Sequence, residues 1–316
     1  FEDAYKKKEL PHFFKASGVL ALAAVVGVCI NISNLYHTYE YSKETMRGKS
    51  ELKQEGAAAS QTSSGLDRDY ITNWSYGIGE TLTLLVPNVK GGGSGSTMSQ
   101  SEAAMAKANP MYNGIYSQLP QYFGEQPWTA GPVYVGAFVM FLFVLGCFIV
   151  KGPLKWALLG ATIFSILLSW GKNFMGLTDF FIDYVPMYNK FRAVSSILVI
   201  AEFTIPLLAI FALKEILSKP DMLKQEKNCR GVIAALVLTA GVALILAVAP
   251  GTFFSSFITT QEMTALKQAL PAEHLAPFVA NLTEMREAII ASDAWRSFFI
   301  IVIGCLFLFL YQLRKL

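Results

Sequence analysis

Long uninterrupted apolar stretches are the feature that most constrains how this chain of 316 residues can fold. The clearest one, residues 231–250, reads GVIAALVLTAGVALILAVAP and has no polar face. An α-helix rises about 1.5 Å per residue, so about 20 residues cross a hydrocarbon core of about 30 Å. Because the helices of a soluble all-α protein keep a polar face, the sequence predicts an integral membrane protein.

Six stretches approach or reach the spanning length, and we therefore expect an all-α, polytopic bundle of about six transmembrane helices. Charged residues make up only 16% of the chain, against about 25% in a typical soluble domain, which argues against an ordinary soluble enzyme. The predicted spans are residues 16–35, 132–150, 154–170, 194–213, 231–250 and 297–312.

The distribution of Lys and Arg predicts the orientation of these spans. Half of the 26 basic residues fall in a few short segments on one side of the membrane, and such segments are typically cytoplasmic. Both ends of the chain are then expected in the cytoplasm, and the large loops outside. The expected inner segments are 1–15, 151–155, 214–230 and 313–316, and the outer loops are 36–131, 171–193 and 251–296.

The remaining composition excludes several kinds of site. None of the 4 cysteines lies in an outer loop, so a disulfide framework is excluded by position. No Cys/His cluster has zinc-ligand spacing, and the 3 histidines are far apart. A net charge of +3 does not point to nucleic acid. We expect no cofactor, and leave a divalent metal open.

The first outer loop combines aromatic and acidic side chains. Aromatic residues beside a membrane boundary are most simply an interfacial belt. The alternative is a groove for a lipid or a sugar, because the rings stack on apolar faces while their polar tips form hydrogen bonds. Two small-residue tracts, 56–65 and 90–97, are expected to be flexible. The groove candidates are Asp69, Trp74, Glu80, Glu125 and Trp128.

The second outer loop carries basic residues that the topology does not explain. Lys172, Lys190 and Arg192 lie outside, where Lys and Arg can bind lipid phosphates. The alternative is that they pair with aspartates of the same loop or with bulk headgroups. The half-apolar spacing also predicts a short interfacial helix, capped at Thr178 and ending before Pro186.

A carboxylate within a predicted span is a further candidate. Glu202 lies eight residues into the fourth span, where a charge is costly unless it faces protein, water or a cation. Its expected partners include Lys172 and Arg192. A structural role in fixing the helix packing is the equally open alternative.

The third outer loop is expected to form two helices. Thr259 and Glu262 fit a capping box, Pro271 interrupts the helical pattern, and Asn281 is predicted to cap the start of a second helix that leads into the sixth span.

Four segments together resemble one family. They are NISNLYHTYEYSKETMRGKSEL (31–52), NWSYGIGETLTLLVPN (73–88), YFGEQPWTAGPVYVGA (122–137) and SWGKNFMGLTDFFIDYVPMYNKFRAVSSILV (169–199). They closely resemble bacterial YfhO-family membrane proteins of the Bacteroidetes type, and the resemblance covers nearly the whole chain.

The resemblance implies a GT-C-like glycosyltransferase in the bacterial inner membrane, which takes its sugar from a polyprenyl-phosphate donor on the outer face. In the family, the acidic first outer loop lies upstream of the segments matched here. We therefore expect an internal fragment, with the catalytic carboxylate supplied by the rest of the same polypeptide and membrane lipids as further partners. The donor-phosphate candidates are Arg47, Lys172, Lys190 and Arg192.

Two other classes of function stay open at this point. The first is a transporter or lipid flippase in which Glu202 couples to ions. The second is a non-catalytic membrane scaffold that binds envelope partners through its outer loops.

Overall fold

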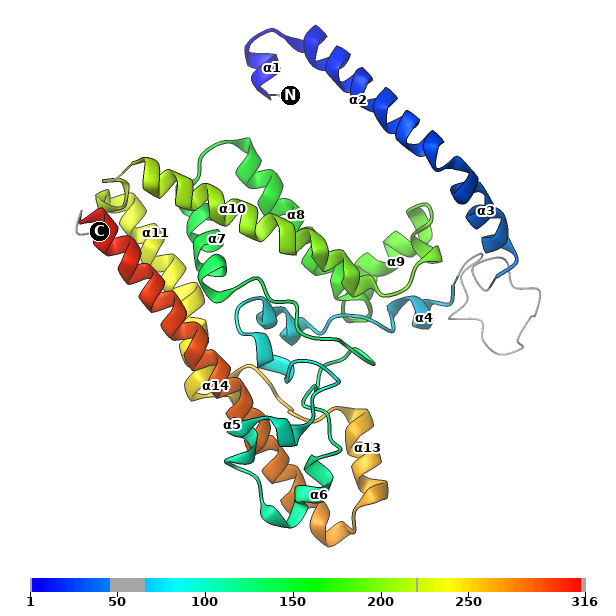
Figure 1. Ribbon diagram of the computed structural model, residues 1–316, viewed down its shortest axis with the longest axis vertical. Helices are drawn as coiled ribbons and strands as arrows, with labels where there is room; N and C mark the ends of the chain where they lie inside the picture. Colours follow the sequence, from blue (N-terminus) through cyan, green and yellow to red (C-terminus); the bar gives the residue numbers. More distant parts are fainter. Residues whose placement is uncertain (1, 46–65, 220, 314–316) are drawn as a thin grey trace. The chain divides into compact units, whose positions relative to one another are not determined.

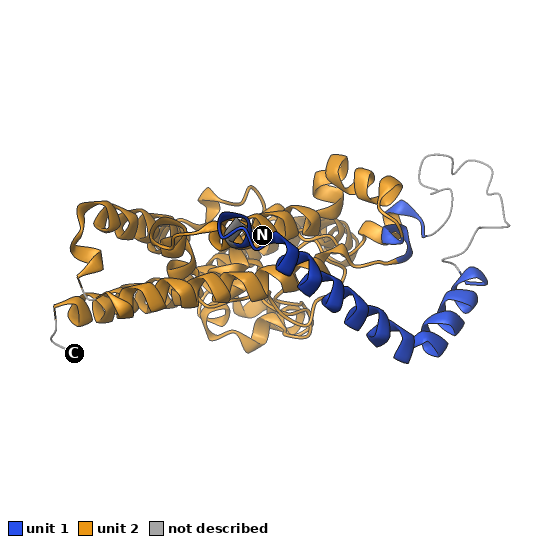
Figure 2. Ribbon diagram, turned by 90° about the horizontal axis from the view of Figure 1, so that it is seen from above, with its two compact units in different colours: residues 1–68, 187–190 blue, residues 69–186, 191–316 orange. Residues whose placement is uncertain are grey.

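The computed structural model describes residues 2–45, 66–219 and 221–313. It divides into two compact units: unit 1 is Phe1–Arg68 with Met187–Lys190, and unit 2 is Asp69–Pro186 with Phe191–Leu316 (Figure 2). The described residues form helices and loops and contain no strand, only an isolated bridge between Thr97 and Pro120. The predicted all-α class is confirmed.

The elements follow one another along the chain as shown in Figure 1. The α-helices are α1 (Glu2–Lys6), α2 (Leu10–Ile30), α3 (Ile32–Lys43), α4 (Arg68–Thr72), α5 (Glu102–Met105), α6 (Asn113–Tyr116), α7 (Ala137–Ile149), α8 (Pro153–Ser169), α9 (Met175–Tyr184), α10 (Val199–Ser218), α11 (Glu226–Leu236), α12 (Val242–Val248), α13 (Thr260–Ala269) and α14 (Ala272–Gln312). The short helical segments are η1 (Ile78–Leu84), η2 (Pro87–Lys90), η3 (Met98–Gln100), η4 (Pro110–Tyr112), η5 (Gly171–Phe174), η6 (Tyr188–Lys190), η7 (Val194–Leu198), η8 (Met222–Lys224), the π-helical η9 (Val237–Gly241) and η10 (Pro250–Thr252).

Among the described residues, 4 helices are long and apolar enough to cross a membrane. They are Leu10–Ile30, Val194–Ser218, Glu226–Val248 and Ala272–Gln312. The number becomes 5 if Pro153–Ser169 and Gly171–Tyr184, which are bent by 109°, form one broken span or a re-entrant loop. The protein is therefore a multi-pass membrane protein by the length and composition of its helices, and the figure of six spans stays a prediction.

Unit 1 is built around α2. No residue of α2 is buried, and the helix is long and apolar enough to cross a membrane. Asn31 separates α2 from α3, and its side-chain amide donates to the carbonyl of Gly27 at 3.4 Å.

The apolar part of unit 2 is a helix bundle in which α10 packs against α7 and α8, and α12 against α14. The buried face of α10 includes Ala201, Ile205, Leu208 and Ala212, which recur at three- and four-residue spacing. Inside the bundle the hydroxyls of Thr162 and Thr204 lie 2.7 Å apart and form a hydrogen bond. A polar pair of this kind connects helices where apolar packing alone has little direction.

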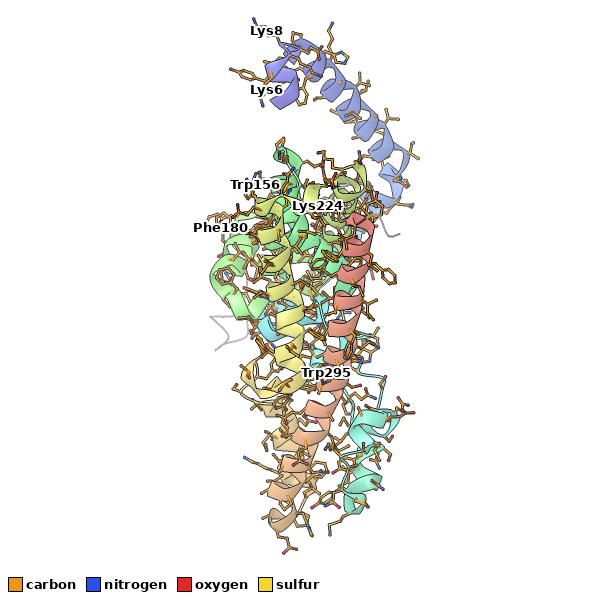
Figure 3. The ribbon with its side chains drawn as sticks, turned by 90° about the vertical axis from the view of Figure 1, so that its left-hand side faces the viewer. Lys6, Lys8, Trp156, Phe180, Lys224 and Trp295 are labelled. Atoms are coloured by element: carbon orange, nitrogen blue, oxygen red, sulfur yellow. The ribbon has the colours of Figure 1, made fainter. Side chains whose placement is uncertain are left out.

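One end of this bundle is basic and polar. Lys224 lies in the connection between α10 and α11, and Tyr311 near the end of α14 donates to the carbonyl of Leu217 at 3.1 Å. Figure 3 shows Lys224 beside the C-terminal end of α14, whereas Trp295 lies partway along that helix.

The elements α5, α6, α13 and the N-terminal half of α14 gather at the other end of α14 (Figure 1). We name them the outer lobe, after the predicted outer loops to which they belong. Apolar residues from all four helices and the adjoining loop form a second core. Its fully buried members are Met98, Ala104, Tyr116, Phe278, Leu282 and Met285.

The third outer loop follows the sequence prediction in part. Thr259 caps α13, with its hydroxyl accepting from the amide of Glu262 at 3.2 Å, and Pro271 separates α13 from α14. The predicted helix start at Asn281 is wrong, because α14 already begins at Ala272. The side chain of Asn281 instead accepts from the Tyr116 hydroxyl at 2.6 Å and donates to the carbonyl of Lys107 at 2.8 Å.

The second outer loop contains the expected short helix. It is α9, which ends at Tyr184 before Pro186 but begins at Met175 rather than after Thr178. The hydroxyl of Thr178 donates to the carbonyl of Gly171 at 2.8 Å, and so links α9 to η5 instead of capping the helix.

A buried ion pair joins α13 to α14. The Arg286 side chain is fully buried, and its two terminal nitrogens each lie 2.7 Å from an oxygen of Glu262. Nη1 also donates to the carbonyl of Phe257 at 2.6 Å, and the guanidinium lies 4.8 Å from the ring centroid of Phe123. This bidentate contact fixes the start of α13 against α14.

We predict that Arg286→Met destabilises the outer lobe by about 3–5 kcal/mol, because it leaves the Glu262 carboxylate largely buried without its partner. Replacing both residues with Met should recover most of this loss. Thermal unfolding of the purified protein in detergent measures the effect. Arg230→Met, which removes an exposed Arg–Glu pair, is the matched control and should change the midpoint little. Equal losses in the single and double variants would contradict this account.

Candidate functional site

A cleft of about 870 Å³ opens in unit 2 at the end of the bundle where α8 finishes and α10 starts. Its walls come from several parts of the chain: the 119–127 segment, the 256–262 segment that leads into α13, and the single residues Asn73, Lys90, Ser94 and Lys172. Two of the predicted candidates, Glu125 and Lys172, lie in this wall although they come from different outer loops.

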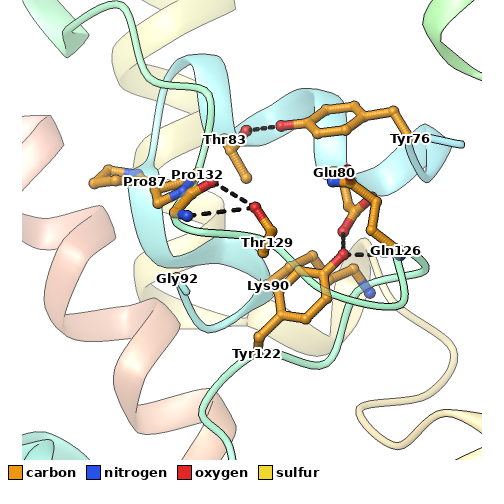
Figure 4. Close-up of a pocket in the computed structure, with 11 residues that line it drawn as sticks. Tyr76, Glu80, Thr83, Pro87, Lys90, Gly92, Tyr122, Gln126, Thr129 and Pro132 are labelled. Atoms are coloured by element: carbon orange, nitrogen blue, oxygen red, sulfur yellow. Dashed lines mark hydrogen bonds between the residues drawn. The ribbon is translucent and has the colours of Figure 1, made fainter. Parts of the chain in front are cut away.

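A buried carboxylate organises the wall. Glu80 in η1 is only 1% exposed, and its oxygens accept from the amide of Gly77 at 2.6 Å, the Tyr122 hydroxyl at 2.5 Å and the amide of Glu125 at 3.3 Å. Burial raises the pKa of Glu80, and the three donors oppose this by stabilising the ionised form. Figure 4 shows the Tyr122 hydroxyl pointing at Glu80.

Gly124 explains how close the chain passes to this carboxylate. A Cβ at position 124 would lie 1.7 Å from Oε1 of Glu80. Only glycine fits there, so the YFGEQPW segment can wrap around the carboxylate. The Tyr122 hydroxyl also accepts from the amide of Gln126 at 2.9 Å, which closes the turn.

Side chains fill nearly all of the space next to Glu80. Tyr76 and Thr83 share a hydrogen bond of 2.5 Å, and Thr83 donates to the carbonyl of Val133 at 2.9 Å. The space left between them and Tyr122 is about 10 Å³ (Figure 4). Burial raises the pKa of Tyr76, so its hydroxyl stays protonated and acts as a structural donor.

Glu125 and Lys172 lie next to each other in the cleft wall. Nζ of Lys172 lies 3.9 Å from Oε2 of Glu125, and both side chains are nearly half exposed. The side-chain amide of Asn173 donates to the same oxygen at 2.9 Å and to the carbonyl of Tyr76 at 3.0 Å. An exposed ion pair of this length is weak, so both charges remain available to a ligand.

The backbone before Lys172 is held tightly. Gly171 has a φ of +45°, and a Cβ there would lie 2.1 Å from the hydroxyl oxygen of Ser75. That hydroxyl accepts from the amide of Lys172 at 2.8 Å. The position of Lys172 is therefore set by its backbone, while its long side chain reaches the cleft.

Arg192 belongs to a neighbouring cluster. Its guanidinium donates to the Tyr70 hydroxyl at 2.8 Å and lies 5.0 Å from the ring centroid of Trp74. Trp74 in turn donates to the carbonyl of Trp128 at 3.2 Å. The predicted residues Trp74, Trp128 and Arg192 thus come together, but none of them lines the cleft.

The other candidates lie apart from the cleft. Asp69 belongs to α4, and Lys190 ends η6 in unit 1. Glu202 is an exposed residue in the first turn of α10, where the helix dipole favours a carboxylate. Lys172 and Arg192, its expected partners, bond instead to Glu125 and Tyr70. Arg47 lies outside the described residues.

Lys90 is a residue of the cleft that the sequence analysis missed. It is the first residue of the 90–97 tract that was expected to be flexible, and its carbonyl accepts from the amide of Phe123 at 3.0 Å. Its ammonium lies 4.3 Å from the ring centroid of Phe254 and 5.0 Å from that of Phe123. Burial lowers the pKa of Lys90. Its position at the start of a small-residue tract gives no signal of this enclosure.

Within the described ranges, no group of three or more His, Cys, Asp or Glu residues is placed to hold a metal ion. The cleft offers instead amines, carboxylates, hydroxyls and amides, which suit a ligand rich in hydrogen-bonding groups.

No protein-family model, curated protein or solved structure matches this chain significantly.

We predict that Tyr122→Phe destabilises the region around Glu80, and more so at high pH. The hydroxyl stabilises ionised Glu80, and a hydrogen bond to a charged group contributes about 1.5–3 kcal/mol. The pKa of Glu80 is raised in the folded protein. The contribution of Glu80 to the free energy of unfolding therefore falls as the pH rises from the pKa of an unfolded Glu to the raised pKa of the folded state. Removing the hydroxyl raises that pKa further.

Thermal unfolding at pH 4 and pH 8 tests this. The loss at pH 8 should exceed the loss at pH 4, where Glu80 is protonated and the missing hydroxyl removes only a bond to a neutral carboxyl and the bond from the amide of Gln126. Tyr184→Phe, at a position 74% exposed, is the control. Equal losses at the two pH values would show that the hydroxyl does not stabilise the charge.

Proposed function

We propose that this chain is the central membrane portion of a glycosyltransferase that uses a polyprenyl-phosphate-linked sugar on the outer face of the bacterial inner membrane. The observation that carries the proposal is the cleft at the end of an apolar helix bundle, with the weakly paired Lys172 and Glu125 in its wall. A lipid-linked donor has an apolar tail, an anionic phosphate and a hydroxyl-rich sugar. Those three parts correspond to the apolar bundle, Lys172 and the polar cleft.

In the proposed reaction, the acceptor oxygen attacks the anomeric carbon of the sugar. The bond from that carbon to the phosphate oxygen breaks, and the polyprenyl phosphate leaves with the bonding electrons. The acceptor proton passes to a carboxylate supplied by the rest of the polypeptide. Lys172 supplies positive charge where the negative charge of the leaving phosphate develops.

The buried carboxylate is not suited to accept that proton. Both oxygens of Glu80 are occupied by hydrogen-bond donors, and the residue is buried. We assign Glu80 to holding the wall and Glu125 to orienting ligand hydroxyls.

We predict that Lys172→Gln weakens binding of a polyprenyl-phosphate-linked hexose by about tenfold to a hundredfold, because a charge-assisted hydrogen bond contributes about 1.5–3 kcal/mol. Arg192→Gln should have a smaller effect, since Arg192 is stacked on Trp74 outside the cleft. Lys107→Gln, at an exposed residue outside the cleft, is the control. Binding of the full-length protein in nanodiscs is measured by microscale thermophoresis. Unchanged affinity in Lys172→Gln would refute the role of this residue.

The proposed orientation has its own test. In a cysteine-free background, Gly95→Cys should react with a membrane-impermeant maleimide in intact cells, because position 95 is exposed and its Cβ would meet open space. Ser218→Cys should react only after the membrane is permeabilised. The reverse pattern would overturn the proposed topology.

A further inference from the structure

A second, smaller hollow of about 150 Å³ adjoins the cleft. Lys90, Glu125 and Ser256 line both spaces, so the hollow and the cleft share these three residues. The rest of its lining is Phe253, Phe254 and Ser255, which follow the end of α12, and Gly77, Gly79 and Glu80 in and before η1. The hollow thus combines an amine, a carboxylate, hydroxyls and an aromatic ring.

The ammonium of Lys90 has no carboxylate within 4.0 Å in the part of the chain that the structure describes. Two ring faces cover it instead, those of Phe254 and Phe123. Cation–π contacts stabilise a charge by about 0.5–2 kcal/mol, but they leave its N–H donors without acceptors. The hydrogen-bonding capacity of this amine is therefore available to a ligand.

The charges around the hollow balance. Glu262 is neutralised by Arg286, and Glu125 faces Lys172. The opposite charge that acts most on Lys90 is that of Glu80, whose carboxylate favours the charged form of the lysine. An anionic ligand would meet no net positive potential here. A neutral ligand with many hydroxyls can donate to Glu125 and accept from Lys90 at the same time.

The aromatic wall narrows the class of ligand further. Phe253 is 40% exposed, whereas Phe254 is 8% exposed beneath the ammonium. The free face of Phe253 offers an apolar surface next to polar groups. A pyranose has the matching pattern, with C–H groups on its faces and hydroxyls around its edge.

We propose that this hollow is a sugar subsite, in which a single pyranose lies against Phe253 with its hydroxyls bonded to Lys90 and Glu125. The sugar of the lipid-linked donor then occupies the hollow, while its phosphate lies in the cleft near Lys172. The subsite rests on the proposed function only for the identity of the lipid carrier.

The test uses the full-length protein in nanodiscs and three kinds of probe: farnesyl-phosphate-linked hexoses, farnesyl phosphate, and free methyl glycosides of glucose, mannose, galactose and N-acetylglucosamine. Lys90→Met keeps the stem between the two rings, and Phe253→Leu keeps an apolar side chain at a half-exposed position. Both variants should bind the sugar-bearing lipid about tenfold or more weakly and lose a methyl glycoside signal in saturation-transfer NMR. Their affinity for farnesyl phosphate should not change.

Two controls make the readout specific. Lys107→Met should leave the affinity for all three probes unchanged, and unfolding midpoints close to that of the unsubstituted protein show that each variant is folded. Lys172→Met should weaken both lipids, with or without the sugar, because its role is in binding phosphate.

The outcomes separate the two proposals. If Lys90→Met weakens farnesyl phosphate as much as the sugar-bearing lipid, Lys90 binds phosphate and the sugar subsite is refuted. If no probe carrying a sugar binds better than farnesyl phosphate, and no methyl glycoside binds, the subsite is also refuted while the lipid-phosphate site stands. If methyl glycosides bind in a Lys90-dependent manner but neither lipid binds, the subsite is supported and the polyprenyl-phosphate donor is refuted.

Discussion

The buried carboxylate of Glu80 is the constraint on which the cleft depends. A charge removed from water must be matched by donors, and here the amides of Gly77 and Glu125 and the hydroxyl of Tyr122 match it. Meeting that requirement fixes the course of the chain from Tyr122 to Gln126. The same turn presents the Glu125 side chain to the cleft, so the site is shaped by the cost of burying a neighbouring charge.

A second constraint acts through helix length. At about 1.5 Å per residue, the 41 residues of α14 extend for about 60 Å, roughly twice the hydrocarbon core of a bilayer. The helix must therefore project from the membrane, and its projecting half buries Phe278, Leu282 and Met285 in the outer lobe. Arg286 on the same half then holds α13 through Glu262.

The sequence was sufficient for the all-α class of the fold, and it singled out two residues that line the candidate cleft. Apolar length predicts the membrane helices, and the residue types and loop positions of Glu125 and Lys172 mark these two residues as candidates. Asn281 shows a limit, because an Asn–x–x–Glu pattern at a helix start is indistinguishable from an Asn that bonds to a distant loop at Lys107 and Tyr116. Lys90 shows a second limit of prediction from sequence. Its enclosure depends on Phe254, more than 160 positions away in the sequence, and no local pattern encodes such a contact.

The continuity of α14 ties the outer lobe to the lipid around it. A straight helix acts as a lever, and tilting it by about 5° moves a point about 25 residues beyond the pivot by roughly 3 Å. Helices adjust their tilt to the thickness of the bilayer. Because the Glu262 side of the cleft is clamped to this helix by Arg286, any tilt of the helix is passed on to that wall of the cleft.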